Sequence, residues 1–403
     1  MENAFIYDGL RTPFGRYAGA LSSIRPDDLM AKTVATLLAR SPFDRGDVED
    51  VIIGCCNQAG EDCRNVGRRT ALLAGLPVDV AGSTVHRQCG SGMNAVLDAA
   101  RCCEAGMGEL FVAGGVESMS RGPYVIGKGT KPFDRSVELY DSTAGSRFPN
   151  PALTELYGDH TMPETADQIG WDLGIGREKS DAFALASQQK YAAAKSRGFY
   201  DDELMDLEVP GLRRGETATV SEDEHPRPDS NAQALGKLRA LNKDGVVTAG
   251  NSSGINDGAS ALIVGTVAAG LRAGAEPIAR IVAGAVSGIE PRVMGLGPVP
   301  ATKKALGRSG LTLSDMDVIE INEAFATQVL GCTKQMGIAG DDSRLNPNGG
   351  AIAIGHPLGA SGGRLILTAI RQLRAIGGRY ALVTLCIGIG QGIATIVENL
   401  DST

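Results

Sequence analysis

Three residues of this 403-residue chain stand in settings that suit nucleophilic and proton-transfer chemistry: Cys89, His356 and Cys386. Cys89 is followed by Gly-Ser-Gly, which predicts a glycine-flanked turn at the start of a helix. Backbone N–H groups and the positive helix end at such a turn favour the thiolate, which is the reactive form of cysteine. A buried cysteine beside a turn is also common without a function, so both interpretations stay open for Cys89 alone.

His356 lies between Gly355 and Pro357, a sequence that disfavours both a helix interior and a central strand. A costly local geometry of this kind indicates that the segment serves a function. Histidine is the side chain best suited to proton transfer near neutral pH. A single histidine is more often structural, but this one directly precedes a helix that repeats the helix after Cys89.

Two further segments carry polar or reactive groups at the ends of apolar strands. Cys386 ends such a strand, and the glycines of 388–392 imitate part of a dinucleotide-binding fingerprint. Too few residues follow to build the required βαβ unit, so we expect a turn that presents Cys386 and backbone N–H groups. Asn322 and Glu323 follow another apolar strand, where polar groups are rare without a role or a partner.

An internal repeat indicates which elements position these residues. Residues 91–108 match 361–378 at seven of 18 positions, and each segment predicts a helix followed by an apolar strand. A second match pairs 50–53 with 317–320 in the same order. We therefore expect two duplicated α/β halves packed back to back, with Cys89 and His356 at equivalent helix starts.

The segment 121–242 interrupts this pattern, because it is richer in proline and charge and shows one clear helix at 180–197. We interpret it as a loop-rich insertion. The first half then consists of residues 1–120 and 243–275, and the second half of residues 276–403.

Composition excludes several classes of protein. The net charge of −8 disfavours a nonspecific nucleic-acid binder, and no run of 18 to 20 apolar residues predicts a transmembrane helix. The N-terminus shows no signal-peptide pattern, so we expect a cytoplasmic protein. The eight cysteines lack the spacing of a disulfide framework or a zinc site, and no metal is expected.

Cys89 with Gly90–Gly92, the Asn-Glu-Ala-Phe box at 322–325, the Gly-His-Pro segment at 355–357 and Cys386 with Gly388 together resemble the thiolase family. The four segments occur in the family's order and spacing, and the similarity covers essentially the whole chain. The resemblance implies a five-layered α/β/α/β/α core with an inserted loop domain. One departure is that His86 stands where the family usually has asparagine.

The resemblance also implies roles for individual residues. Cys89 would carry the acyl group, His356 would activate it, and Cys386 would exchange the α-proton of acetyl-CoA. One oxyanion would be stabilised by His356 and a water held by Asn322, and the other by the backbone N–H groups of Cys89 and Gly388. The residues that match substrate-binding positions of the family are Ser253 for pantetheine, Ala249 beside it, Phe325 and Met162 for the pocket lining, and Arg227 near the nucleotide.

The implied activity is the reversible cleavage of 3-oxoacyl-CoA by CoA, with CoA as co-substrate, no resident cofactor, and a homodimer or homotetramer as the assembly. A decarboxylating condensing enzyme would pair its cysteine with two histidines, or with histidine and asparagine, whereas this chain has Cys386. A non-catalytic acyl-CoA-binding relative would be expected to have lost Cys89, His356 or Cys386, and all three are present.

Segments 57–68 and 162–167 resemble those thiolases that split 3-oxoadipyl-CoA into succinyl-CoA and acetyl-CoA. The distal carboxylate of that substrate needs a cation, because burying it unpaired costs several kcal/mol. Arg64, Arg68 and Arg69 are candidates, unless they lie at a subunit interface or pair with Glu61 and Asp62. A general thiolase for acetoacetyl-CoA or other 3-ketoacyl-CoA esters of fatty-acid metabolism is the alternative.

Overall fold

The computed structural model describes residues 3–129, 131–211, 213 and 215–401, and its centre is one ten-stranded mixed sheet. The strands of this sheet are β1 (Phe5–Arg11), β2 (Gly15–Arg16), β3 (Asp50–Gly54), β4 (Ala81–Val85), β5 (Leu110–Ser118), β10 (Asn256–Gly265), β11 (Ala279–Gly288), β12 (Val318–Ile321), β13 (Tyr380–Ile387) and β14 (Gln391–Asn399). Their order is β12-β13-β14-β11-β1-β10-β5-β3-β4, and β2 pairs with β10.

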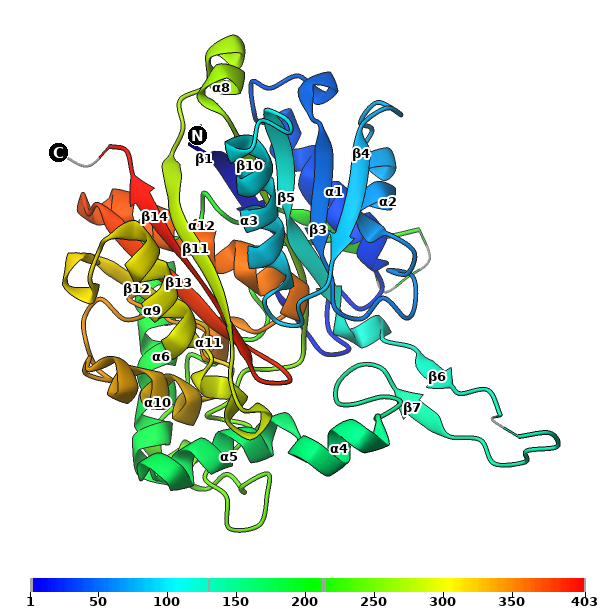
Figure 1. Cartoon of the computed structure of the whole chain (residues 1–403), viewed down its shortest axis with the longest axis vertical. Coiled ribbons are helices and arrows are strands. Elements are labelled where there is room, and N and C mark those ends of the chain that lie inside the picture. Colours follow the sequence, from blue (N-terminus) through cyan, green and yellow to red (C-terminus); the bar gives the residue numbers. More distant parts are fainter. Residues whose placement is uncertain (1–2, 130, 212, 214, 402–403) are drawn as a thin grey trace.

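The sheet consists of two halves that are joined over a short stretch (Figure 1). In the first half β3 runs parallel to β4 and β5, and β10 pairs antiparallel with β5 and β1. In the second half β12 and β13 are parallel, and β14 pairs antiparallel with β13 and β11. Between β1 and β11 only Phe5–Arg280 and Ile6–Ala279 are paired, so each half keeps its own layer.

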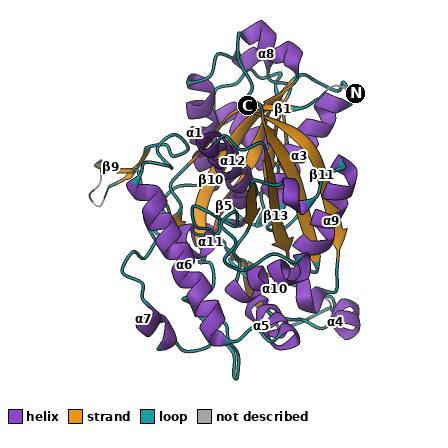
Figure 2. Ribbon diagram, turned by 90° about the vertical axis from the view of Figure 1, so that its left-hand side faces the viewer, coloured by secondary structure: helices purple, strands orange, loops and turns teal. Residues whose placement is uncertain are grey.

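Helices cover both faces of each half, which gives five layers (Figures 1 and 2). The central layer holds α3 (Ser91–Glu104) and α12 (Leu358–Ile376), and the outer layers hold α1 (Pro26–Ala39) and α2 (Val66–Leu73) on one side and α9 (Pro298–Ser309) and α10 (Ala326–Met336) on the other. The side chains of β5 alternate accordingly. Val112 packs in the outer core with α1, whereas Phe111 and Ala113 pack in the central core with α3 and α12. The predicted fold class is confirmed.

Glycines let the two central helices touch at their first turns. A Cβ on Gly92 of α3 would lie 2.3 Å from the carbonyl oxygen of Gly359 in α12. A Cβ on Gly362 of α12 would lie 2.2 Å from the backbone nitrogen of Met93. Real Cβ atoms are not found so close to backbone atoms, so this contact requires glycine at both positions. The start of α3, beside Cys89, therefore lies against the start of α12, beside His356.

The segment between the two parts of the first half contains more helix than the sequence predicted. Its elements are β6 (Tyr124–Ile126), β7 (Leu139–Asp141), α4 (Pro151–Tyr157), α5 (Met162–Leu173), α6 (Arg177–Ser196), β8 (Leu207–Pro210), β9 (Thr217–Val220) and α7 (Ala232–Gly236). The predicted helix at 180–197 corresponds to α6. The start of α5 carries a sequence signal that the prediction missed, because Thr161 and Glu164 form a capping box.

The hairpin of β6 and β7 projects from the body of the molecule (Figure 1). Its apolar side chains are exposed, including Tyr124, Ile126 and Leu139. The remaining helices are α8 (Val267–Ala273) and the short α11 (Ala351–Ile354), which lies just before His356. In the part of the chain that the structure describes, no helix combines the length and apolarity needed to cross a membrane.

Candidate active site

Cys89 lies in a strained turn directly before α3. The preceding residue, Gln88, has a φ of 46°, which is the left-handed region that non-glycine residues rarely occupy. Ser91 secures this geometry, because its hydroxyl donates to the Gln88 carbonyl at 2.6 Å and accepts from the Arg87 N–H at 2.8 Å. The turn therefore holds the Cys89 thiol in a fixed position.

The end of β13 packs directly on this turn. A Cβ on Gly90 would lie 2.6 Å from the Cδ1 of Ile387, so the strand end and the turn are in close contact. The backbone N–H groups of Gly388 and of Cys89 itself hydrogen-bond to the Cys89 sulfur and stabilise its thiolate. Burial outweighs them and raises the pKa of Cys89 to about 11. The N–H groups favour the thiolate, as expected, but they do not offset burial, so Cys89 needs a base.

His356 is a buried and neutral imidazole. Its ring Nδ1 lies 2.6 Å from the Ser361 hydroxyl, which itself donates to the Pro357 carbonyl at 2.8 Å. The serine oxygen therefore accepts from Nδ1–H, and the free lone pair of the ring is on Nε2. Burial and the charge of Arg364 lower the pKa of His356 to about 3, so the ring is uncharged at neutral pH. The backbone N–H of His356 donates to Asn256 at 2.9 Å.

Asn322 reaches the same place from the end of β12. Its Nδ2 lies 3.4 Å from the Nε2 of His356, and its backbone N–H donates to Thr384 at 3.0 Å. Its Oδ1 is buried and has no hydrogen-bond partner among the described residues. A buried amide oxygen without a protein partner is available to a ligand or a water.

Glu323, next along the chain, has a structural explanation. Its carboxylate accepts hydrogen bonds from Ser187 at 2.6 Å, from Asn346 at 2.8 Å and from the backbone N–H of Ile352 at 3.2 Å. These contacts hold the segment that leads to His356, so Glu323 supports the site without entering it.

Cys386 is 1% exposed and belongs to an apolar cluster with Phe325, Met294 and Ala166. Burial, together with electrostatic interaction with the Cys89 and Cys332 thiols, raises its pKa well above the usual range. Cys386 is therefore a protonated thiol at neutral pH, close enough to Cys89 for their charges to interact. Such a thiol is suited to donate a proton and recover it later in the same reaction.

The predicted CoA-binding residues lie beside the Asn-Glu-Ala-Phe box. The backbone N–H of Ser253 donates to the carbonyl of Ala324 at 2.9 Å, and Ser252 pairs with Phe325. Ala249 lies exposed in the turn that precedes Ser253.

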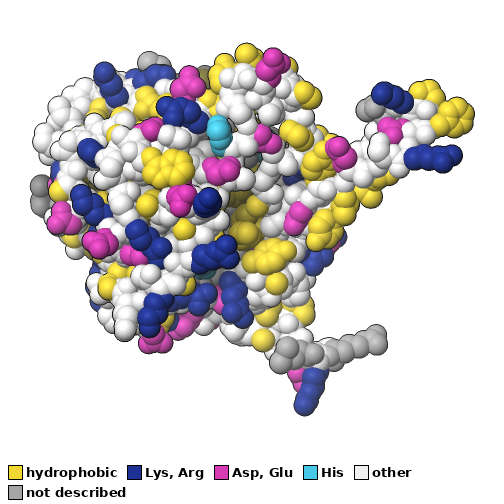
Figure 3. All heavy atoms as spheres, turned by 90° about the horizontal axis from the view of Figure 1, so that it is seen from below, with side chains coloured by type: hydrophobic (Ala, Val, Ile, Leu, Met, Phe, Trp, Pro, Cys, Tyr) yellow, Lys and Arg dark blue, Asp and Glu magenta, His cyan; other side chains and the backbone are white. Residues whose placement is uncertain are grey.

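Two predicted residues lie farther from the reactive thiols. Met162 is the first residue of α5, four residues before Ala166 of the Cys386 cluster, and is 37% exposed. Arg227 is exposed, and its loop contacts the Ser253 segment because His225 packs on Gly254. Seen from below, Lys and Arg side chains surround a recess with hydrophobic side chains in its depth (Figure 3).

Glu117 is a supporting residue that the sequence analysis missed. Its buried carboxylate accepts from the backbone N–H groups of Cys56 at 3.1 Å, Asn57 at 3.0 Å and Gly359 at 2.9 Å. It therefore ties the loop after β3 to the start of α12, and burial raises its pKa to about 7. A glutamate in the otherwise apolar strand 110–118 was the signal that could have identified it.

Cys55 and Asp62 place ligand atoms near those of Glu117, within 4.8 Å of one another. The three backbone N–H groups on Glu117 and the N–H of Gly60 on Asp62, at 3.0 Å, already explain why these carboxylates are buried here. The group therefore needs no metal ion to account for it.

The arginines proposed for a distal carboxylate are engaged elsewhere. Arg68 donates to the carbonyls of Val78 and Val80, and Arg69 donates to Asp27 at 3.3 Å and to the Glu61 carbonyl at 2.8 Å. Arg64 is exposed.

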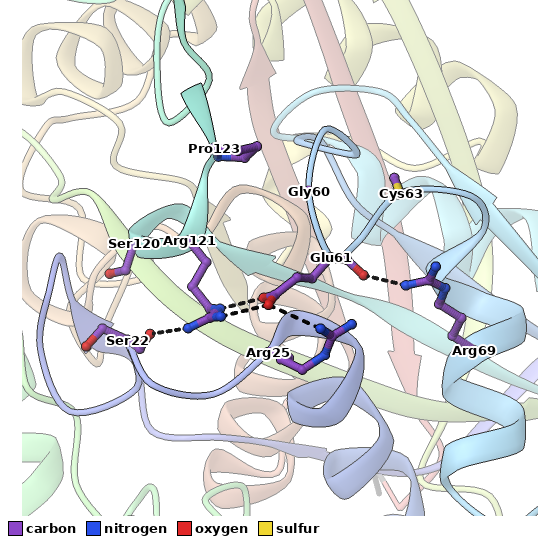
Figure 4. A pocket seen from close by; sticks show the side chains of 9 residues that line it. All are labelled: Ser22, Arg25, Gly60, Glu61, Cys63, Arg69, Ser120, Arg121 and Pro123. Atoms are coloured by element: carbon purple, nitrogen blue, oxygen red, sulfur yellow. Dashed lines mark hydrogen bonds and ion pairs between the residues drawn. The ribbon is translucent and has the colours of Figure 1, made fainter. Parts of the chain in front are cut away.

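Glu61 itself pairs with two other arginines. Its carboxylate lies between Arg25 and Arg121 at the edge of an open pocket of about 540 Å³ (Figure 4). Of the predicted pairings, only a backbone contact between Arg69 and Glu61 is present. Arg68 and Arg69 therefore stabilise the segments around Glu61 and Val80.

The structure thus has a buried imidazole at the start of α12, a glycine-flanked thiol at the start of α3 and a buried thiol at the end of β13. The chain matches the family descriptions "Thiolase, N-terminal domain" over residues 4–268 and "Thiolase, C-terminal domain" over residues 275–399. It belongs to the thiolase family, and it is an acyltransferase.

Particular relatives are similar over their whole length. A beta-ketoadipyl-CoA thiolase of Acinetobacter baylyi is 52% identical over 402 residues, which cover 99% of this chain and 100% of that protein. A 3-oxoadipyl-CoA/3-oxo-5,6-dehydrosuberyl-CoA thiolase of Escherichia coli shows the same identity and coverage. The crystal structure of human mitochondrial 3-ketoacyl-CoA thiolase in complex with CoA superposes with a TM-score of 0.90 at 38% identity, covering 99% of this chain and 98% of that chain.

Proposed function

We propose that the protein cleaves 3-oxoadipyl-CoA with CoA, giving succinyl-CoA and acetyl-CoA, as a step of aromatic-compound degradation. The observation that supports this substrate is the 52% identity, over the whole chain, to relatives named for it. CoA acts as a co-substrate, and the chemistry uses side chains and backbone groups of this chain without a resident cofactor.

In the first half-reaction Nε2 of His356 takes the proton of Cys89, and the sulfur attacks the 3-oxo carbon of the substrate. The bond between the α- and β-carbons then breaks. The succinyl group stays on Cys89, and the electron pair passes to the acetyl-CoA enolate, which Cys386 protonates at carbon. The buried, neutral states of both partners suit this sequence, because each proton moves only when substrate is present.

In the second half-reaction the Cys386 thiolate takes the proton of the incoming CoA thiol, whose sulfur attacks the succinyl thioester. Cys89 leaves as a thiolate and recovers its proton from His356. The enolate oxygen is stabilised by Nε2–H of His356 and a water on Asn322. The acyl-enzyme oxyanion is stabilised by the N–H groups of Cys89 and Gly388.

The CoA moiety extends from this site over the Ser253 segment. Ser253 and Ala249 contact pantetheine, Phe325 and Met162 line its path, and Arg227 lies toward the nucleotide. The hydrogen bond from the Ser253 N–H to the Ala324 carbonyl supports this course, because Ala324 belongs to the same box as Asn322.

A thiolysis assay with 3-oxoadipyl-CoA, acetoacetyl-CoA and a neutral six-carbon 3-oxoacyl-CoA tests the substrate. We expect the highest kcat/KM for 3-oxoadipyl-CoA. A higher value for either neutral ester would replace the proposal with a general 3-ketoacyl-CoA thiolase, a function supported by the likeness to the human enzyme.

A homodimer or homotetramer in the cytoplasm completes the proposal. Exposed apolar side chains on the β6–β7 hairpin support self-association, and eight free cysteines suit a reducing compartment. Sedimentation of the full chain, compared with a variant whose hairpin tip is made polar, tests the assembly. A monomeric full chain would contradict it.

A further inference from the structure

A succinyl group on Cys89 brings a negative charge into the site. Its distal carboxylate is two methylene groups beyond the thioester carbonyl, so it lies within about 5 Å of that carbon when the chain is extended. A carboxylate that close to a buried centre needs a cation or several donors. The search for such a group rests on the proposed function, because a neutral acyl chain would need none.

Most arginines in the neighbouring loops already have acidic partners or donate to several carbonyls. Arg25 and Arg121 pair with Glu61, and Arg69 pairs with Asp27. Arg87, near Cys89, donates to the side chains of Asn94 and Gln391. Arg147 differs in having a single short hydrogen bond and no side-chain partner among the described residues. It is half-buried, donates from Nη2 to the Asn57 carbonyl at 2.6 Å and only distantly from Nη1 to the Ser142 carbonyl at 3.4 Å, and forms no ion pair with any carboxylate of the described residues.

A series of hydrogen bonds connects Arg147 with the nucleophile turn. Asn57 shares the Glu117 carboxylate with Cys56, and the Cys56 thiol donates to the Gln88 carbonyl at 2.9 Å, one residue before Cys89. On the other side Arg147 lies near His86, three residues before Cys89. Desolvation and the charge of Arg147 lower the pKa of His86, whose side chain is exposed. An imidazole ring can donate an N–H to a carboxylate.

The backbone that carries Arg147 is fixed before substrate arrives. Ser142 is buried, and Asn57 donates from Nδ2 to its carbonyl at 2.8 Å and to its hydroxyl at 3.2 Å. The Ser142 hydroxyl in turn donates to the Pro123 carbonyl at 2.6 Å. A guanidinium held in this way loses little entropy when it binds a carboxylate, which favours selection for a charged acyl chain.

We propose that Arg147, with the imidazole of His86 near it, binds the distal carboxylate of the acyl group carried by Cys89. Nε and the free hydrogens of the Arg147 guanidinium make the charged contact, and His86 adds one donor. This assigns a function to the histidine that stands where thiolases usually have asparagine.

The test compares Arg147→Gln with the wild type on 3-oxoadipyl-CoA and acetoacetyl-CoA. Loss of a charge-assisted contact should lower kcat/KM for 3-oxoadipyl-CoA by about 10- to 100-fold, mainly through KM. The value for acetoacetyl-CoA should change less than about threefold, and Arg147→Lys should recover part of the loss. The matched control Arg69→Gln should leave the ratio of the two substrates unchanged.

Acylation of Cys89, measured by itself, distinguishes a defect in carboxylate binding from a defect in folding. Mass spectrometry should show slower labelling of Cys89 by succinyl-CoA in Arg147→Gln, with unchanged labelling by acetyl-CoA. Equal losses on both esters would overturn the inference, because they would show that Arg147 only supports the Asn57 loop. If the wild type prefers 3-oxoadipyl-CoA and Arg147→Gln keeps that preference, the inference is wrong and the proposed function stands. A wild type that prefers neutral esters would overturn the proposed function, and the inference with it.

Discussion

The first turns of α3 and α12 are equivalent in sequence and different in use. Ser91 and Ser361 occupy matching positions of the repeat. The hydroxyl of Ser91 bonds to its own turn, at Gln88 and Arg87, and also lies 3.6 Å from the Cys56 sulfur. It fixes the backbone that presents Cys89. The hydroxyl of Ser361 also donates to its own turn, but it accepts from the ring of His356 and sets which nitrogen is the base.

The difference shows how one local motif supports two kinds of chemistry. A serine in a first helical turn can donate to the carbonyl three or four residues earlier, which leaves its lone pairs for another donor. In α3 the group that donates to the serine oxygen is a backbone N–H, and the result is a rigid turn. In α12 the group that donates to the serine oxygen is an imidazole N–H, and the result is a base with a fixed orientation.

The largest effect should come from removing the nucleophile of the first turn. Cys89→Ser should lower kcat by about 10³-fold or more, because a hydroxyl is a far weaker nucleophile than a thiol with this base. Incubation with an acyl-CoA and peptide mass spectrometry should place the acyl group on Cys89 of the wild type. Acylation of Cys386 alone would reverse the roles of the two thiols.

Cys386→Ser is the matched variant. It should still be acylated at Cys89, while exchange of the acetyl-CoA methyl protons with deuterated water becomes much slower. Undiminished exchange would remove Cys386 from the proton transfer.

Separating the two turns should have the next largest effect. Gly362→Ala places a methyl group 2.2 Å from the Met93 nitrogen, so α3 and α12 must move apart. We expect a loss of about 1–3 kcal/mol in the free energy of unfolding and a fall in kcat of about 100-fold. Gly307→Ala in α9, where no atom lies within 4 Å of the added Cβ, is the control and should not destabilise the protein. Full activity in Gly362→Ala would show that the helix contact does not set the site.

Exchanging the two serines for alanine tests the comparison directly. Ser361→Ala should lower kcat by about 10-fold or more with little change in Tm, since the base loses its orientation. Ser91→Ala should lower Tm more, because the strained turn at Gln88 loses two hydrogen bonds. Thermal unfolding and steady-state kinetics on both variants measure the two effects. Identical profiles would mean that the serines have the same role.

The last test uses no substitution and concerns the protonation of Cys89. Burial raises the pKa of Cys89 to about 11. At any pH below that value, the thiolate fraction therefore grows about tenfold for each unit by which the pH rises. The rate of alkylation of Cys89 by iodoacetamide should therefore rise about tenfold per unit from pH 7 to 9. A plateau near neutral pH would show that the helix end and the N–H groups outweigh burial.

The sequence alone predicted the repeated helices and the two α/β halves, because these depend on local periodicity, whereas the five layers were implied by the resemblance of its motifs to the thiolase family. The sequence did not predict that burial would outweigh the N–H groups at Cys89, because the burial of this thiol results from residues far apart in the chain. The partners of Glu117 and Arg147 were missed for the same reason, since they join segments far apart in the chain. The placement of the predicted site residues in a working reaction stays a prediction until the variants above are measured.

The glycine contact between α3 and α12 also has a consequence for the origin of the chain. The nucleophile belongs to one copy of the repeat and the base to the other, so a half-length ancestor had only one of them at each helix start. Such an ancestor could form this centre only as a pair of subunits that met across these two helices. Fusion of the two copies then freed each helix start to change independently, and the shared serine records the common starting point.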